Sequence, residues 1–246
     1  MKGFFHAFVM CQSMFCAIPC PCKIWDEDAR DKLLWCLPLV GLEIGIVWYL
    51  VFWLCGFFGL PGLLQGAVLC VAPLILTGCI HLDGFMDVTD SVRSCRDLER
   101  RREILKDSHV GSFAVIGCIM LVLLQFAACA GAGTWADAGM LMLIPVVSRS
   151  CSALAVAVLP KMSTSQYVKK TARPADIGIP VVCVLLCFIG AVCLWPMYVW
   201  AILAELIVYG LALRKAYKSL GGMNGDISGY ALTLSELGAL VALSIL

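Results

Sequence analysis

Long apolar segments constrain this chain more than any other feature of its sequence. A helix that crosses the hydrocarbon core of a bilayer needs about 20 predominantly apolar residues, at a rise of about 1.5 Å per residue. The sequence therefore predicts an all-α, polytopic membrane bundle with about seven transmembrane helices. We expect the crossings at Trp35–Phe58, Gly62–Ile80, Val110–Ala130, Ala138–Pro160, Ile177–Trp195, Met197–Leu213 and Ala231–Leu246.

The composition supports a membrane location and excludes two other classes of protein. Of the 246 residues, 61% are apolar and 14% are charged, whereas roughly 25% are charged in soluble globular domains. Seven crossings leave few other residues, so we predict one membrane-embedded domain over residues 1–246 and no separate soluble domain. The net charge of +1 provides no basic surface for nucleic acid, which leaves the lipid bilayer as the expected surroundings.

The amino-terminal segment Met1–Cys22 is partly apolar but carries His6, Gln12 and Ser13. It fits poorly to a cleaved signal peptide, so we expect an interfacial helix that stays attached. The sequence leaves open whether this segment spans the membrane or lies on it. The 15 cysteines include no CxxC pair and are expected to fill space as small apolar residues rather than to bind zinc.

Basic residues are distributed unevenly among the predicted connections. The connections Gly59–Pro61, Gly131–Asp137 and Trp195-Pro196 contain none. All except Arg149 lie in the other connections, at Lys2, Lys23, Arg30, Lys32, Arg93, Arg96, Arg100, Arg101, Arg102, Lys106, Lys161, Lys169, Lys170, Arg173, Arg214, Lys215 and Lys218. Because Lys and Arg are enriched in cytoplasmic loops, we expect a multi-pass protein of the cell membrane (plasma or inner membrane). Its amino terminus and long polar loops would then be cytoplasmic, and its carboxyl terminus external if the amino-terminal segment does not span.

Three aspartates follow the second predicted crossing at helical spacing. Asp83, Asp87 and Asp90 stand at positions i, i+4 and i+7, which places their carboxylates on one face of a helix. Their like charges repel, and a divalent cation would offset the repulsion. Oxygen ligands suit Mg²⁺ or Mn²⁺, and substrate phosphates usually complete the shell of Mg²⁺. The alternative to a metal site is an acidic helix end that is simply solvated. Gly84, which follows the first aspartate, would let backbone or substrate approach closely.

Polar residues near the aspartates extend the candidate site. His81 is either a hydrogen-bonded structural residue or a base or phosphate donor. Lys106, Asp107 and Ser108 immediately precede the third crossing and fit a phosphate-facing loop. The charged run before them is expected to form a solvated amphipathic helix, with contact to anionic headgroups as the alternative.

Ionisable residues also occur within or next to other crossings. In Gly221–Gly229, flexible glycines and a helix start can receive phosphate, although glycines alone indicate only a turn. Asp226 in this segment would add a second metal-binding side chain. Ionisable residues inside crossings usually mark ion pairs or polar cavities, so Arg149 is expected to pair with an acid, and the group could line one pocket that opens to the cytoplasm. The acids inside crossings are Glu43, Glu205 and Glu236.

Taken together, these segments resemble the adenosylcobinamide-GDP ribazoletransferase (cobalamin synthase) family over nearly the whole chain. Thr77-Gly78 through Ser91 is similar to the family signature T-G-G-x-H-L-D-G-x-x-D-x-x-D-[GS]. Cys79, Asn224 and Thr233 depart from the Gly, Thr and Glu that are usual at those positions. Further similarity lies in Glu103 with Lys106-Asp107-Ser108 and Gly111, Ser148-Arg149, Gly221-Gly222 with Asn224-Gly225-Asp226 and Gly229, Glu236, and Pro38 to Gly41 with Gly45.

The resemblance implies a phosphoryl transfer. The cobinamide-phosphate group of adenosylcobinamide-GDP would pass to the 5′-hydroxyl of α-ribazole, or to α-ribazole 5′-phosphate, giving adenosylcobalamin or its 5′-phosphate and GMP. Mg²⁺ is the implied cofactor, with Asp83, Asp87, Asp90 and Asp226 as ligands. The other implied roles are a general base at His81 or one of the aspartates, phosphate or hydroxyl contacts from Lys106, Asp107 and Ser108, and substrate binding by Arg149, Asn224 and Gly225.

Two other functions are compatible with parts of the pattern. A CDP-alcohol-type membrane phosphotransferase also carries aspartates at helical spacing, but its signature D-x-x-D-G-x-x-A-R is not present in this sequence. An ion transporter would distribute its carboxylates over the depth of the bilayer, whereas these cluster at one face. The sequence leaves open the oligomeric state, including a homo-oligomer, the number of metal ions, the lower-base preference and the phosphorylation state of the acceptor.

Overall fold

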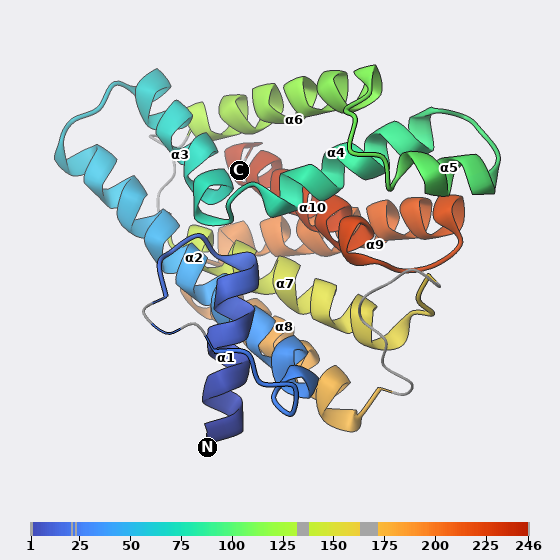
Figure 1. Ribbon diagram of the computed structural model, residues 1–246. Coiled ribbons are helices and arrows are strands. Elements are labelled where there is room, and N and C mark those ends of the chain that lie inside the picture. The colour runs from blue at the N-terminus through green and yellow to red at the C-terminus, as the bar shows by residue number, and fades with distance from the viewer. Residues whose placement is uncertain (1, 21, 23, 132–137, 163–171, 246) are drawn as a thin grey trace.

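The computed structural model describes residues 2–20, 22, 24–131, 138–162 and 172–245, which form helices and no β-strand (Figure 1). The longer helices are α2 (Leu33–Phe57), α6 (Ser112–Ala130), α7 (Met140–Val158), α8 (Pro174–Leu194), α9 (Val199–Leu220) and α10 (Gly225–Ile245). The shorter ones are α1 (Lys2–Phe15), α3 (Gly62–Leu76), α4 (Ile80–Arg93), α5 (Leu98–Ile104) and the 3₁₀ turns η1 (Arg30–Lys32) and η3 (Pro196–Tyr198). The predicted all-α fold is confirmed.

Within the described residues, six helical segments are long and apolar enough to cross a membrane. A further pair, α3 and α4, passes the same test together but is bent by 90°. The count of six, or seven with the bent pair, confirms a multi-pass helical membrane protein. The six segments are Arg30–Phe57, Ser112–Ala130, Met140–Val158, Pro174–Leu194, Pro196–Leu220 and Gly225–Ile245.

The break between α3 and α4 differs from the continuous crossing predicted at Gly62–Ile80. Helix α3 has only 15 residues. The Thr77 hydroxyl donates a hydrogen bond to the Pro73 carbonyl at 2.9 Å, and Gly78 and Cys79 follow with φ angles of +58° and +60°. Left-handed residues of this kind end a helix. The aspartates therefore lie on a separate helix, α4, and not at the end of a straight crossing.

Side chains from two neighbouring helices hold α3 in place. Pro73 has no backbone N–H, so the carbonyl of Leu69 lacks its usual helical donor. The indole N–H of Trp48 donates to that carbonyl at 2.9 Å, and the Gln125 amide donates to the Cys70 carbonyl at 2.9 Å. Because an unpaired backbone group is costly in an apolar interior, these bonds fix α3 against α2 and α6.

Helices α7 and α10 form the centre of the bundle. They are the two most buried of the candidate spans, and α10 packs against α4, α6, α7 and α9 (Figure 1). On α2, a Cβ atom at Gly41 or Gly45 would overlap the α7 backbone near Pro145 and Met142. Small residues four positions apart let membrane helices approach closely. The glycines of α2 therefore let its backbone come close to that of α7.

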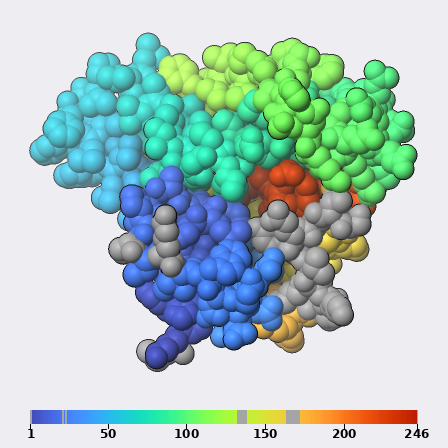
Figure 2. Space-filling model, in the orientation of Figure 1, coloured from blue at the N-terminus to red at the C-terminus, as the bar shows by residue number. Residues whose placement is uncertain are grey.

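Helix α1 is the amino-terminal helix that the sequence predicts. It has 14 residues and is not among the candidate spans. It packs on α2, and the blue amino-terminal segments form the lower part of the face seen in Figure 2. The His6 ring and Asp26 lie 2.7 Å apart, and the Ala17 N–H donates to the Leu76 carbonyl at 2.7 Å. The segment thereby ties the start of α2 to the end of α3, while its interfacial location stays a prediction.

Several basic connections meet at one end of the bundle. Arg173 pairs with Asp31 at 3.2 Å, which joins the starts of α8 and α2. Lys161 forms a backbone bridge with Met223, which joins the end of α7 to the start of α10. The starts of α2 and α10 also line one cavity. The cytoplasmic orientation of this end stays a prediction, and its residues Lys23, Lys169 and Lys170 lie outside the described part of the chain. Residues 132–137 of the predicted external connection also lie outside it.

Candidate active site

The aspartates of α4 face the amino-terminal turn of α10. A Cβ atom on Gly84 would lie 2.9 Å from Asp226 Cα, and one on Gly229 would lie 3.1 Å from the His81 carbonyl oxygen. Thr233 also donates a hydrogen bond to that carbonyl at 3.1 Å. Because Gly84 and Gly229 have no side chains, the two helix backbones come close enough to place Asp226 beside the aspartates of α4. The predicted close approach at Gly84 is therefore real, and its partner is α10.

Four carboxylates from the two helices interact electrostatically. Asp87 interacts with Asp83, Asp90 and Asp226, and Asp226 also interacts with Asp83. Asp83 is exposed, whereas the other three are partly buried. We call these four residues the carboxylate cluster. Like charges gathered in a partly desolvated place are unfavourable unless a cation or a proton compensates.

The donor chemistry of the carboxylate cluster fits a hard divalent cation. Among the described residues, no three His, Cys, Asp or Glu side chains lie close enough to hold a metal ion by themselves. Mg²⁺ does not require such a cage, because it usually binds one or two carboxylates, several waters and the substrate phosphates. The cluster therefore fits Mg²⁺ bound together with a phosphate substrate better than it fits a preformed protein site.

Asp90 has a structural partner that sequence reasoning missed. Its Oδ1 atom accepts a hydrogen bond from the Ala114 N–H at 3.3 Å, in the first turn of α6. A Cβ atom on Gly111 would overlap the same carboxylate. An acidic group near helix amide donors stabilises the helix start, so Asp90 links α4 to α6. Gly111, which the sequence offers as part of the family resemblance, was the available signal.

Asn224 caps α10 and orients Asp226. The Asn224 side-chain oxygen accepts a hydrogen bond from the Ile227 N–H at 2.9 Å, and its amide donates to Asp226 Oδ2 at 2.6 Å. Asn and Thr are both favoured at the residue before a helix. The departure from the family's usual Thr at this position therefore preserves the helix start.

Arg149 pairs with Glu236, one of the three acids that the sequence offers. The Arg149 side chain is 1% exposed, and its Nη1 lies 2.6 Å from Glu236 Oε1. The Ser148 hydroxyl donates to the same carboxylate oxygen at 2.8 Å. Glu43 instead accepts a hydrogen bond from the Gln12 amide at 3.0 Å. The expected ion pair is thus confirmed, and it joins α7 to α10.

Glu205 of α9 lies behind this pair. It is fully buried and interacts electrostatically with Glu236 and Arg149. The backbone of Ser148 approaches the Glu205 carboxyl group, but within the described part of the chain neither carboxyl oxygen has a hydrogen-bond partner of good geometry. Three of the four predicted intramembrane residues therefore form one polar group, and Glu43 does not join it.

A cavity of about 390 Å³ extends from the start of α10 to Arg149. Helices α1, α2, α4, α7 and α10 enclose it. In Figure 2, the red surface of α10 is visible between the blue amino-terminal helices and the green segments. Of the predicted site residues, the cavity is lined by His81, Arg149, Asn224, Gly225 and Asp226.

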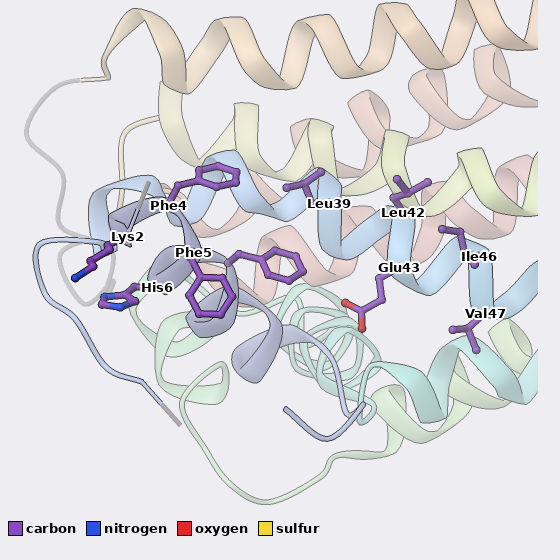
Figure 3. Close-up of a pocket in the computed structure, with 10 residues that line it drawn as sticks. Lys2, Phe4, Phe5, His6, Leu39, Leu42, Glu43, Ile46 and Val47 are labelled. Carbon is purple, nitrogen blue, oxygen red and sulfur yellow. The ribbon is translucent and has the colours of Figure 1, made fainter. Parts of the chain in front are cut away.

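A larger hollow of about 1350 Å³ lies between α1 and α2 (Figure 3). Its walls are mainly apolar and include Phe4, Phe5, Leu39 and Leu42. Glu43 is its only acidic lining residue among the described residues. This groove contains none of the predicted site residues, so its size does not make it the candidate active site.

The loop that carries Lys106, Asp107 and Ser108 lies apart from the cavity. All three residues are exposed, and none of them lines the cavity with His81 and Arg149. Hydrogen bonds from the backbone and ring of His109 lower the pKa of Asp107. The contact of Asp90 with Gly111 and Ala114 brings the end of this loop against α4.

The arginines before that loop have mainly structural partners. The Arg101 guanidinium donates to the Ser219 carbonyl at 3.3 Å, and Arg102 donates to the Leu220 carbonyl at 2.9 Å. These carbonyls belong to the last turn of α9. The carbonyl groups of a last helical turn have no N–H partner within the helix, so the arginines satisfy them. The run forms helix α5, as predicted, and stabilises the end of α9.

The fold and the site define a multi-pass helical membrane protein with an acidic centre beside a cavity that is lined by both apolar and polar residues. The family model described as cobalamin-5-phosphate synthase matches residues 7–244. The chain belongs to this family, which confirms the resemblance drawn from the motifs.

Curated relatives that are similar over their whole length are named adenosylcobinamide-GDP ribazoletransferase. The protein of Clostridium perfringens (strain SM101 / Type A) is 38% identical over 254 residues, which cover 100% of both chains. That of Clostridium botulinum (strain Alaska E43 / Type E3) is 33% identical and covers 96% of each chain. That of Desulfitobacterium hafniense (strain Y51) is 36% identical over 89% of this chain and 88% of the relative. No solved structure matches the chain significantly.

Proposed function

We propose that this chain is an adenosylcobinamide-GDP ribazoletransferase that acts with Mg²⁺ in a late step of cobalamin biosynthesis. Family membership and the names of full-length relatives support the activity. The structural observation on which the proposal depends is the close packing of α4 on α10. This packing places Asp226 beside Asp83 and Asp87.

The reaction exchanges one phosphorus–oxygen bond for another. A ribose hydroxyl of the acceptor forms a bond to the cobinamide-linked phosphorus, the bond from that phosphorus to the GMP oxygen breaks, and the hydroxyl proton passes to a base. When α-ribazole 5′-phosphate is the acceptor, its 5′-oxygen already carries phosphate, so the 2′- or 3′-hydroxyl must attack. Phosphoryl transfer of this kind depends mainly on positioning and charge neutralisation.

The carboxylate cluster is the proposed Mg²⁺ site. Of the proposed ligands Asp83, Asp87, Asp90 and Asp226, one or two would bind the ion directly and the others would act through its bound waters, while Asp90 Oδ1 stays on α6. Bound Mg²⁺ would neutralise phosphate charge and favour the loss of GMP. Asn224 contributes by holding Asp226 in place.

The remaining predicted residues have roles around the cluster. His81 or one of the aspartates accepts the hydroxyl proton, and the exposed start of α10 at Gly225 offers amide groups to a phosphate. Lys106, Asp107 and Ser108 are exposed and contact the diphosphate of the donor from outside. The basic end of the bundle faces the cytoplasm under this proposal, because Lys and Arg are retained there.

Activity measurements with purified protein in detergent test the proposal. Adenosylcobinamide-GDP, α-ribazole and Mg²⁺ should yield a cobalamin and GMP. Chelation of Mg²⁺ should stop turnover, and added Mg²⁺ should restore it. The CDP-alcohol-type alternative predicts turnover of a CDP-alcohol and none of adenosylcobinamide-GDP.

Neutralising the aspartates provides the first mutational prediction. Asp83→Asn and Asp87→Asn should each reduce turnover by at least about 100-fold, a loss of about 2.7 kcal/mol, because each removes a ligand oxygen charge. Neither should lower the melting temperature, since each also relieves repulsion. Asp28→Asn is the matched control, because Asp28 is exposed and lies on the loop before α2. Near-normal turnover of either variant at limiting Mg²⁺ would refute the site.

A further inference from the structure

The enclosed cavity has two walls of different chemistry. One wall comes from the end of α1 and the start of α2 and carries Phe15, Leu33, Leu34 and Leu37. The opposite wall comes from α4, α7 and α10, where polar residues stand among Ile80, Val156 and Leu232. It is lined by His81, Arg149, Ser152, Asn224, Asp226 and Ser228. A ligand that fills this cavity therefore needs an apolar part on one side and several polar groups on the other.

Two buried polar atoms on the polar wall point to a ligand. His81 Nε2 and Arg149 Nε are both buried and have no hydrogen-bond partner among the described residues. Arg149 is 1% exposed although it lines the cavity. Buried polar groups in native proteins nearly always have partners. Hydroxyl groups of a bound sugar would supply them here.

The size of the cavity distinguishes between the two substrates of the proposed reaction. Cavities of about 300–1,000 Å³ enclose drug-sized ligands, and this one measures about 390 Å³. A nucleoside such as α-ribazole belongs to that size class. Adenosylcobinamide-GDP carries a corrin macrocycle, an adenosyl group and a nucleotide, and it is far too large to be enclosed.

Two members of the carboxylate cluster line different hollows, which adjoin at Met14 and Ile80. Asp226 lines the enclosed cavity. Asp83 instead lines a hollow of about 500 Å³ beside the α3–α4 turn, together with Thr77 and Gly78. Two substrates that approach from these two sides would meet at the aspartates. This is the arrangement that direct transfer between a donor and an acceptor requires.

We infer that the enclosed cavity is the acceptor subsite and that its leucine wall selects the base. The planar, uncharged base of α-ribazole lies against Leu33, Leu34 and Leu37, and its ribose lies toward His81, Arg149 and Asp226. Adenosylcobinamide-GDP binds on the side of Asp83. This assignment rests on the proposed function and adds to it which substrate occupies which side of the carboxylate cluster.

Filling the apolar wall tests the assignment. Leu34 is partly exposed within the cavity wall, so Leu34→Trp should raise the KM for α-ribazole by at least about tenfold, or about 1.4 kcal/mol, and leave the KM for adenosylcobinamide-GDP within about twofold. Leu50→Trp is the matched control on the same helix, because Leu50 is 49% exposed on the outer surface. It should change neither constant. Leu34→Phe replaces Leu34→Trp if the latter does not fold.

Equilibrium binding of radiolabelled α-ribazole to the detergent-purified protein separates this inference from the proposed function. Binding that Leu34→Trp weakens and Leu50→Trp does not would support the subsite even in a preparation without turnover. Normal turnover combined with unchanged α-ribazole binding in Leu34→Trp would overturn the subsite and leave the proposed function intact. A raised KM for adenosylcobinamide-GDP alone would also overturn it, since the cavity would then belong to the donor.

Discussion

At the scale of single residues, the most consequential arrangement is the buried pair of Arg149 and Glu236. A charge near the middle of a transmembrane helix costs at least about 2.5 kcal/mol on insertion scales. Arg149 offsets this cost with Glu236 at 2.6 Å and with the Ser148 hydroxyl at 3.2 Å. Arg149 also lines the proposed acceptor cavity, so the same residue joins α7 to α10 and, under the proposed function, would face the substrate.

Breaking the pair should destabilise the protein. Arg149→Met leaves Glu236 buried without its cation, and the loss of one partner of a buried pair typically costs about 3–5 kcal/mol. Adding Glu236→Gln should restore part of the melting temperature in detergent, because the stranded charge is removed. It should not restore turnover, since the proposed contact of Arg149 with substrate would still be missing.

Two double variants provide the control for this prediction. Glu43→Gln or Glu205→Gln, combined with Arg149→Met, should restore less stability than Glu236→Gln does, because neither residue accepts a hydrogen bond from Arg149. Equal rescue by all three substitutions would contradict the pairing. Normal turnover of Arg149→Met would contradict its contact with substrate.

At the scale of helices, the packing of α4 on α10 decides whether the carboxylate cluster exists. Gly84→Ala would place a Cβ atom 2.9 Å from Asp226 Cα, and backbone on both sides leaves no flexible side chain to move. Overpacking of this kind typically costs about 1–3 kcal/mol. A misplacement of about 1 Å at a reacting centre can cost about 100-fold in rate. We therefore expect a larger effect on turnover than on melting temperature.

Gly210→Ala on α9 is the matched control for Gly84→Ala. No heavy atom lies within 4 Å of a Cβ placed there. Alanine should stabilise the helix by up to about 1 kcal/mol and leave turnover unchanged. If Gly84→Ala behaved like Gly210→Ala, then the close approach of α4 and α10 would not be needed for activity.

The end of α9 provides another prediction at this scale. Arg102 donates hydrogen bonds to the Leu220 and Gly221 carbonyls at 2.9 and 3.0 Å. Arg102→Met should therefore lower stability by about 1–2 kcal/mol. Arg100→Met should change it by less than about 0.5 kcal/mol, because Arg100 forms only an exposed pair with Glu103. Equal shifts in the melting temperatures of the two variants would show that the contact with α9 contributes nothing.

At the scale of the whole molecule, the orientation in the membrane can be tested directly. Cysteine placed at Arg100 should react with an impermeant thiol reagent only after the membrane is opened. Cysteine at Thr134, in the predicted external connection, should react in intact cells. The native cysteines that react must first be replaced, and exposed examples are Cys22, Cys79, Cys95 and Cys193. Labelling of Arg100→Cys in intact cells would reverse the topology.

The sequence by itself determined the class of fold and most of the residues of the candidate site. The lengths of apolar segments and the spacing of Asp83, Asp87 and Asp90 are local properties, because a helix repeats every 3.6 residues wherever it lies. The segment that contains Asn224 and Asp226 was recognised by its resemblance to a motif of the family. The separation of α3 from α4 was less visible, since it depends on backbone angles at Gly78 and Cys79.

Only the tertiary structure decided which of these residues meet. Three acids were equivalent partners for Arg149 in the sequence, and the packing of α7 on α10 selected Glu236. The packing of α4 on α10 made Asp226 part of the carboxylate cluster, and Ser108 lies outside the cavity. The physical reason is that contacts between helices depend on their rotation and separation. Both are set here by glycines whose missing side chains let particular backbones touch.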